Sequence, residues 1–347
     1  MKGTSVFLDH VAGRRAAALV RDGQLQDLIV DPPDDAPFPA GAILRGIVER
    51  PMKGQGGVFV RLPEGKGYLR APKGLVPGQP VLVQVTGHPE PGKAIPLTPK
   101  LLFKSKYAIV TPDAPGLNLS RQIRDEERRA ELRTLAEELM EGCAYGLILR
   151  SEAESAPETE IVEDIAEMRS LAEAITGAEG SGAELLLDAP DAHALAWREW
   201  GTPDEIVTDP GCFETRGVLD DLADALRFSI PLAGGGSVVI EPTRALVAID
   251  VNTGADTSPA AGLKANLEAA RALPRLLRLR GLGGQIVIDF APLSKKDRRQ
   301  VEQALRSAFR TDPIETALVG WTPLGHFEAQ RKRERLPLDE AILEALQ

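Results

Sequence analysis

Residues 245–254, ALVAIDVNTG, begin as an apolar strand and then place an acid, Asp250, directly after the apolar run. A helical pattern follows at 262–280, and the next strand pattern, QIVIDF at 285–290, carries Asp289 near its end. Strand, helix and strand within about 45 residues form a βαβ unit, whose two strands run parallel with a right-handed crossover. The segment therefore predicts an α/β fold for the last third of the chain.

Three polar side chains are expected to gather where these two strands end. Side chains alternate along a strand, so Asp250 and Asn252 share one face, and a parallel neighbour places Asp289 at the same edge, about 4.8 Å away. Two carboxylates this close repel each other unless a cation lies between them. All three side chains offer oxygen donors, with no His or Cys nearby in sequence, which favours Mg²⁺, or Mn²⁺, over zinc. A simpler interpretation is that both acids cap the following loops. This capping interpretation is more favoured for either acid taken alone than for two acids and Asn252 together at the ends of paired strands.

The composition is that of a soluble globular protein of several domains. The 347 residues are 43% apolar and 27% charged, and no run of about 18 apolar residues suggests a membrane span. The start, MKGTSVFLDHVAGRRAA, lacks the apolar core of a signal peptide, and Cys143 and Cys212 are the only cysteines. These features predict a cytoplasmic protein without a disulfide framework or a cysteine-rich zinc site.

The net charge of −10 is unevenly distributed along the chain. Residues 152–209 hold sixteen acidic and two basic residues, whereas residues 264–335 hold fifteen basic and eight acidic ones. The basic segments RLLRLR, KKDRR (295–299) and RKRER (331–335) accompany the acidic strand ends in sequence. A phosphodiester substrate fits that setting better than a neutral one. Taken alone, the basic residues of these segments are explained equally well as helix faces exposed to solvent.

Residues 41–100 hold short strand patterns that glycine and proline interrupt every 8–12 residues, after a proline-rich boundary at 31–41. This spacing predicts a small closed β-barrel. Phe59 and Tyr68 lie on successive strands of the barrel. The basic residues that accompany them are Arg45, Lys53, Arg61, Lys66, Arg70 and Lys93. OB-type barrels use exposed aromatics among basic residues to stack bases, although such aromatics are more often core residues.

Three segments resemble the catalytic region of the ribonuclease E/G family of bacterial endoribonucleases: GGSVVIEPTRALVAIDVNTGADT, LKANLEAARALPRLLRLRGLGGQIVIDF and GHFEAQRKR. The similarity is continuous over about 100 residues and extends more weakly to the N-terminus. The resemblance implies that Asp250 and Asp289 hold a catalytic Mg²⁺ and that Asn252 supports the site. It also implies cleavage of single-stranded RNA to 5′-phosphate and 3′-hydroxyl products.

The resemblance further implies RNA contacts away from the acids. Two aromatics and a lysine of the barrel match RNA-contacting residues of the family's OB-fold domain. Arg150 and Ser151 match an Arg-Thr pair that grips the 5′-monophosphate of the substrate, and Ile109 lies in the segment matching the loop that completes this pocket. With the basic segment near the C-terminus included, the expected RNA-binding residues are Phe59, Tyr68, Lys93, Arg150, Ser151, Arg331 and Arg333.

The fold implied by the resemblance is α/β (α+β multidomain). A ribonuclease-H-like and deoxyribonuclease-I-like catalytic core carries an inserted OB-fold β-barrel. The expected parts are N-terminal strands of the ribonuclease-H-like subdomain (1–38), the barrel (39–100), a five-prime-end sensor region (101–160), a reduced remainder of the ribonuclease-H-like subdomain (161–226) and the catalytic metal-binding subdomain (227–347).

Two departures from the family pattern leave alternatives open. The Cys-Pro-x-Cys zinc link that follows the catalytic region in family members is not found, so we expect no structural zinc and a monomer or zinc-independent oligomer. Stretch 152–200 is shorter and more acidic than its family counterpart. We expect a Mg²⁺-dependent endoribonuclease of rRNA processing or mRNA decay, with some preference for 5′-monophosphate ends. The alternatives are an RNA-binding or regulatory protein with weak or no nuclease activity, and a metal phosphoesterase for small substrates.

Overall fold

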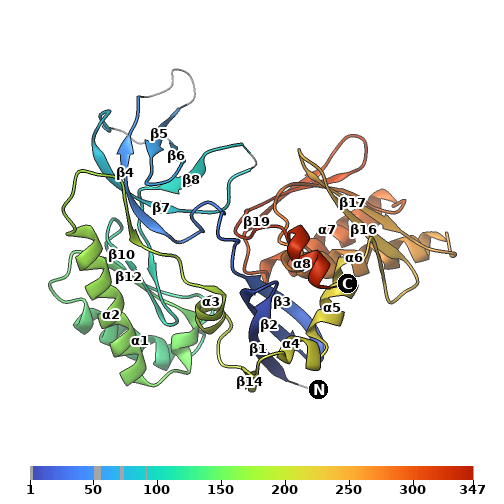
Figure 1. Ribbon diagram of the computed structural model, residues 1–347. Helices are drawn as coiled ribbons and strands as arrows, with labels where there is room; N and C mark the ends of the chain where they lie inside the picture. Colours follow the sequence, from blue (N-terminus) through green and yellow to red (C-terminus); the bar gives the residue numbers. More distant parts are fainter. Residues whose placement is uncertain (1–2, 51–55, 71–73, 91, 347) are drawn as a thin grey trace. The chain divides into compact units, whose positions relative to one another are not determined.

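The computed structural model describes residues 3–50, 56–70, 74–90 and 92–346, which form two compact units (Figure 1). The first unit combines residues 1–33 with 203–347, and the second comprises residues 34–202. The proline-rich boundary predicted at 31–41 coincides with the passage from the first unit to the second. Lys53, one of the basic residues predicted around the barrel, lies outside the described residues.

The first unit opens with three strands, where the sequence of residues 1–30 predicts two or three joined by a turn at Arg21-Asp22-Gly23. These are β1 (Thr4–Val11), β2 (Arg14–Arg21) and β3 (Gln24–Val30). They form two antiparallel hairpins, and β14 (Glu205–Val207) pairs parallel to β1. At the predicted turn, Asp22 and Gly23 have φ angles of 51° and 77°, the positive values that a type I′ hairpin turn requires.

The second sheet of this unit has six strands in the order β15-β16-β17-β18-β20-β19. Their bounds are Ser229–Pro231, Ser237–Pro242, Val247–Asn252, Gly284–Asp289, Phe327–Arg331 and Thr316–Trp321, in that order. β17 and β18 are parallel, and the other neighbouring strands are antiparallel. The helices of the unit are α4 (Cys212–Thr215), α5 (Val218–Leu226), α6 (Pro259–Leu279), α7 (Lys295–Arg310) and α8 (Glu340–Ala345). Because α6 connects the two parallel strands, the predicted βαβ unit is confirmed.

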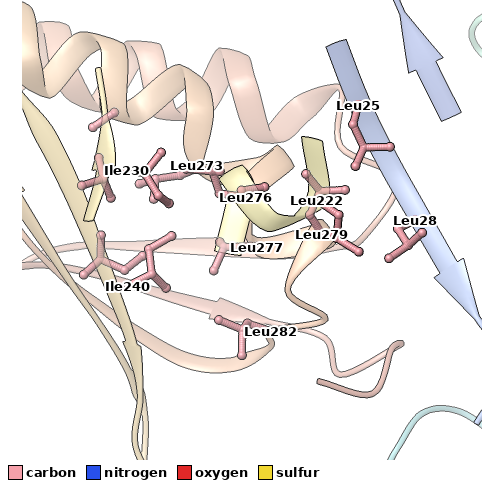
Figure 2. Packing of buried hydrophobic residues seen from close by; sticks show 14 of the residues in the cluster. Leu25, Leu28, Leu222, Ile230, Ile240, Leu273, Leu276, Leu277, Leu279 and Leu282 are labelled. Carbon is pink, nitrogen blue, oxygen red and sulfur yellow. The ribbon is translucent and has the colours of Figure 1, made fainter. Parts of the chain in front are cut away.

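Helix α6 has clear signals at both ends. Ser258 accepts a hydrogen bond from the Ala261 amide at 3.2 Å, and Pro259 suits the first turn, where its missing N–H would have no helical partner. The helix continues through Pro274 and is followed by Gly281, whose φ of 64° is left-handed. Figure 2 shows the core that α6 builds with α5, β3 and β16, formed by Leu273, Leu276, Leu277, Leu222, Leu25, Leu28 and Ile240.

Five strands of the second unit close into a β-barrel consistent with an OB-fold, as the sequence predicts. They are β4 (Ile43–Val48), β5 (Gly57–Arg61), β6 (Lys66–Arg70), β8 (Ile95–Thr98) and β7 (Pro80–Val85), and β7 pairs back onto β4. Glycines allow this tight closure, because a Cβ on Gly67 would lie only 2.1 Å from Leu97 Cδ1. β13 (Glu184–Leu187) pairs with the outer edge of β4.

A four-stranded sheet with its helices completes the second unit. Its strands are β9 (Phe103–Lys104), β10 (Ala108–Thr111), β11 (Leu117–Leu119) and β12 (Gly146–Leu149). Its helices are α1 (Glu126–Leu139), the short 3₁₀ helix Ser151–Glu154, α2 (Glu158–Thr176) and α3 (Ala192–Glu199). Among the described residues, none of the helices has the length and apolar character needed to cross a membrane.

Helix α2 corrects the expected division at 160/161. Residues 161–226 were expected to form one remainder of the N-terminal subdomain, but that boundary falls inside α2. Ile161 and Ile165 of α2 are buried in the same core as β10 and β12, and Figure 1 shows α1 and α2 beside that sheet. Only residues from 203 onward join β1–β3 in the first unit. The segment IVEDIAEMRSLAEAI gives a helical pattern in the sequence, but its acidic residues did not show which core the helix joins.

Candidate active site

The two predicted acids lie opposite each other at the carboxyl ends of β17 and β18. Asp250 and Asp289 are register partners in this parallel pair. Burial alternates around them: Ile249 and Ile288 are 2% and 1% exposed, whereas both acids face solvent. The apolar neighbours anchor the strands in the core, and the period of two brings both carboxylates to the open face.

Asn252 lies with this pair, because its Nδ2 donates a hydrogen bond of 2.7 Å to Asp250 Oδ2. His326 is a neighbour that the sequence analysis missed: its Nε2 lies 3.8 Å from Asp289 Oδ1, since β20 pairs antiparallel with β18. Within the described residues, no group of three or more His, Cys, Asp and Glu side chains could hold a metal ion. The donor set at this edge is therefore two carboxylates and an amide, which fits Mg²⁺ because that ion keeps several waters.

The predicted basic segments differ in their distance from the acids. Helix α7 follows β18 after a short loop, and its first turns carry the exposed residues Lys295, Lys296 and Arg299. Arg298 of the same helix lies over the Trp321 ring, 5.0 Å from its centroid. The segment KKDRR therefore stands near the carboxyl end of β18, where Asp289 lies.

The segment RKRER does not surround the acid pair, which corrects the prediction from charge. Arg331 pairs with Gly284 at the start of β18, about 16 Å along the strand from Asp289. The Arg331 side chain is 0% exposed and donates to Asp312 Oδ1 at 3.1 Å. Arg333 also lies against the start of the strand, since a Cβ on Gly284 would be 2.2 Å from its Nη2. Arg331 is thus committed to the core rather than to an RNA surface.

The two barrel aromatics lie on successive strands, as the sequence predicts, and the structure places their rings against each other. Phe59 and Tyr68 are register partners on β5 and β6, with ring centroids 5.6 Å apart at an interplanar angle of 63°. Both rings are half-buried, and the exposed Arg61, Lys66 and Arg70 share these two strands. Lys66 Nζ lies 3.1 Å from Glu49 Oε2. The arrangement offers partly open rings among exposed cations, which is the chemistry that single-stranded nucleic acid binds.

Two other basic residues of the barrel have acidic partners. Lys93 is 66% exposed, and its Nζ lies 2.5 Å from Glu90 Oε2. Arg45, by contrast, is buried and pairs with Glu184 Oε2 of β13 at 2.5 Å. Its expected place on the basic surface is therefore wrong, because β13 covers the strand that carries it.

Arg150 and Ser151 follow β12, as expected, but protein acceptors surround the guanidinium. Arg150 Nη1 donates to the carbonyl oxygens of Ser105 and Arg198 at 2.6 and 3.0 Å, and Nη2 donates to Glu199 Oε2 at 2.9 Å. Ser151 Oγ donates to Glu152 Oε2 at 3.1 Å. Glu199 comes from α3, far along the chain, and no pattern in the sequence pointed to it. Ile109 lies half-buried on β10.

Fold and site together define a mixed α/β protein with paired acids at a sheet edge and an OB-like barrel that presents paired aromatics. The model of the Ribonuclease E/G family matches residues 103–210 and 204–334. Ribonuclease E of Nostoc sp. is 31% identical over 376 aligned residues, which cover 92% of this chain and 54% of the relative. Ribonuclease G of Escherichia coli is 28% identical over 308 residues, 76% and 62% of the two chains.

The chain belongs to the ribonuclease E/G family. This confirms the resemblance inferred from the three sequence segments. The chain spans about half the length of the ribonuclease E relatives that it matches, 54% for Nostoc sp. and 56% for Synechocystis sp..

Proposed function

We propose that this chain is a metal-dependent endoribonuclease that cleaves single-stranded RNA to 5′-phosphate and 3′-hydroxyl products, in RNA processing or decay. The register pairing of Asp250 with Asp289, beside Asn252, is the observation that carries the proposal. Membership of a family whose members are named ribonucleases supports it.

Asp250 and Asp289 would hold Mg²⁺, or Mn²⁺ in its place, because their exposed oxygen donors suit a hard divalent cation. Such an ion, when bound, activates a water molecule and polarises a phosphodiester oxygen. Asn252 keeps the Asp250 carboxylate in position through its 2.7 Å hydrogen bond. Lys295 and Lys296, exposed at the start of α7, attract the phosphate backbone toward this edge.

The barrel supplies affinity for the strand in this proposal. Phe59 and Tyr68 stack bases, because every base presents a flat face that an aromatic ring accepts. Arg61, Lys66 and Arg70 contact phosphates by charge, and Lys93 contributes when it leaves Glu90. We also assign the sheet of β1–β3 and β14 to a ribonuclease-H-like subdomain and the six-stranded sheet to a deoxyribonuclease-I-like one.

The experiment is cleavage of a labelled single-stranded RNA by wild type and by Asp250→Asn, with Mg²⁺ present. Loss of one of two carboxylates should lower the rate at least about 100-fold, because removing a residue that only orients a metal ligand commonly costs about 10–100-fold. Glu241→Gln is the matched control, since Glu241 is an exposed acid on the neighbouring β16, toward the other end of the strand pair. Equal cleavage by wild type and Asp250→Asn would show that these acids are not the site.

The competing function, an RNA-binding protein without turnover, gives a different result in the same assay. RNA would then bind in the presence of EDTA, and no products would form even at micromolar protein. A metal phosphoesterase for small substrates would instead hydrolyse a model phosphodiester rapidly and leave RNA intact.

A further inference from the structure

Three side chains form one row across the six-stranded sheet of the first unit. Asp250 on β17 is the register partner of Asp289 on β18. On the other side of β18, the antiparallel pairing with β20 ends at Ile288 and Phe327. One step further along the same register, Asp289 faces His326, the residue that precedes β20. Because neighbouring strands lie about 4.8 Å apart, the row places a carboxylate, a carboxylate and an imidazole at successive strand positions.

The imidazole shares the open face of the sheet with the two acids. Ile288 and Phe327, whose side chains point to the opposite face, are 1% and 0% exposed. The side chains of Asp289 and His326 are 65% and 37% exposed, and His326 Nε2 lies 3.8 Å from Asp289 Oδ1. This separation is longer than a hydrogen bond, and rotation of the exposed carboxylate can close it, because the terminal torsion of an aspartate is broad.

The β19–β20 turn holds His326 in this place. The Thr322 amide donates to the His326 carbonyl oxygen at 2.8 Å, and Thr322 Oγ1 accepts from the His326 amide at 3.2 Å. A Cβ on Gly325 would lie only 3.1 Å from Arg298 Nη2, so the turn also passes close to α7. The ring is therefore presented by a closed turn with a fixed backbone.

The two acids differ in the side chain that orients them. Asp250 Oδ2 accepts a hydrogen bond of 2.7 Å from Asn252 Nδ2. For Asp289, the neighbour that offers a nitrogen is His326. An imidazole can present an N–H at Nε2 in its neutral form and in its charged form. Carboxylates that hold a metal ion are usually hydrogen-bonded themselves, and losing that partner commonly costs about 10–100-fold in metal affinity.

We propose that His326 is a positioning residue whose Nε2–H orients the Asp289 carboxylate for a divalent cation, as Asn252 orients the carboxylate of Asp250. The inference rests on the proposed function, which makes the acid pair a metal site. His326 acts through Asp289 rather than on the RNA. Removing its N–H therefore lowers the affinity for the metal and leaves the cleavage rate at saturating metal unchanged.

Binding of Mn²⁺ in the absence of RNA tests this by electron paramagnetic resonance, because the free ion gives a signal that weakens on binding. His326→Leu should bind Mn²⁺ about tenfold more weakly than wild type, since it keeps an apolar side chain of similar size and loses the donor. His326→Gln should bind within about threefold of wild type, because its amide restores an N–H donor. His10→Leu is the matched control: it removes an exposed histidine from β1, in the other sheet of the same unit, and should bind like wild type.

Cleavage of a labelled single-stranded RNA over a series of Mn²⁺ concentrations separates this role from a direct one. His326→Leu should need about tenfold more metal to reach half its maximal rate, and its maximum should lie within about twofold of the wild-type maximum. A clearly lower maximum at saturating Mn²⁺ would mean that His326 acts on the RNA, and it would overturn the positioning role. If His326→Leu does not fold, as judged by its melting curve without metal, His326→Ala removes the same donor.

Two results overturn the role of His326: equal Mn²⁺ affinity in wild type and His326→Leu, or a His326→Gln protein as weak as His326→Leu. Asp250→Asn separates these results from failure of the proposed function. If Asp250→Asn binds Mn²⁺ as tightly as wild type, the acid pair is not the metal site and the proposed function fails. If Asp250→Asn abolishes binding and His326→Leu does not change it, the metal site stands and only the inference about His326 falls.

Discussion

Asp312 lies at the centre of the ion network that buries Arg331, and replacing it with asparagine tests what that arginine does. Its carboxylate is 2.5 Å from Arg278 Nη1 and 3.1 Å from Arg331 Nη2. The side chains of Asp312 and Arg331 are both 0% exposed, so water cannot replace the lost charge. Removing one member of such a pair leaves an uncompensated buried charge and costs about 3–5 kcal/mol of unfolding free energy. For a unit of this size, that lowers the melting temperature by about 6–20 °C.

Glu315→Gln is the matched control for Asp312→Asn. The change from acid to amide is the same, but Glu315 is 73% exposed and pairs with Lys332 at 2.8 Å, a surface contact worth below about 1 kcal/mol. Trp321 reports on this unit because it packs against Phe290 and Phe327.

The assay is a urea titration followed by the fluorescence of Trp321, in a background where the two tryptophans of the second unit, Trp197 and Trp200, are replaced by phenylalanine. Asp312→Asn should unfold at a much lower urea concentration than Glu315→Gln, which should match the parent. Below its transition, Asp312→Asn should still bind RNA like the parent. Equal midpoints for the two variants, or loss of RNA affinity in the folded Asp312→Asn protein, would refute this assignment of Arg331 to the core.

Three other predictions follow from buried ionisable groups. Burial opposes ionisation of Asp27, but Arg335 and a second arginine lower its pKa below the usual 3.8. The contribution of Asp27 to stability is therefore present above about pH 4 and is lost as the pH falls through the pKa of Asp27 in the folded protein. Asp27→Asn should therefore be less stable than wild type at pH 7, with the difference shrinking in acid; a constant difference in unfolding free energy across pH would contradict this. Burial raises the pKa of Cys212 to about 11, so iodoacetamide should modify Cys143 in the native protein and Cys212 only after unfolding, as read by peptide mass spectrometry. Burial and a glutamate partner raise the pKa of Tyr107 to about 12. In a spectrophotometric titration, the tyrosine that ionises at the highest pH should therefore be absent from Tyr107→Phe. If that ionisation step is still present in the variant, another tyrosine is responsible for it.

The parts of the fold that the sequence predicts are those set by neighbouring residues. The βαβ unit could be recognised because a period of two, a period of 3.6 and a period of two follow one another around Asp250 and Asp289. The same alternation places both acids on one face of the sheet, and the parallel register of β17 and β18 makes them direct neighbours. His326 could not be placed, because its approach to Asp289 depends on β20 pairing with β18, and no local pattern specifies that partner.

Glu199 and Arg45 show the same limit for charged residues. Each looks like one surface charge among many in the sequence, and each is instead defined by a partner from a distant segment: Arg150 for Glu199, and Glu184 for Arg45. Helix α2 gave only a weak helical signal in the sequence, for a related reason. Its buried positions are spaced as a helix requires, but the acidic residues between them resemble a solvated stretch.

The density of basic residues along the chain therefore overstates the basic surface near the acids. On α6, Arg275 donates to the carbonyl oxygen of Leu25 and Arg280 to those of Ala225 and Arg227, and burial lowers the pKa of both arginines. These guanidinium groups satisfy backbone oxygens inside the first unit, so they cannot also bind phosphate. Exposed basic side chains follow Asp289 in the chain at the start of α7. An RNA strand that reaches the acids is thus expected to contact Lys295 and Lys296 there, rather than the arginine-rich segments that dominate the sequence.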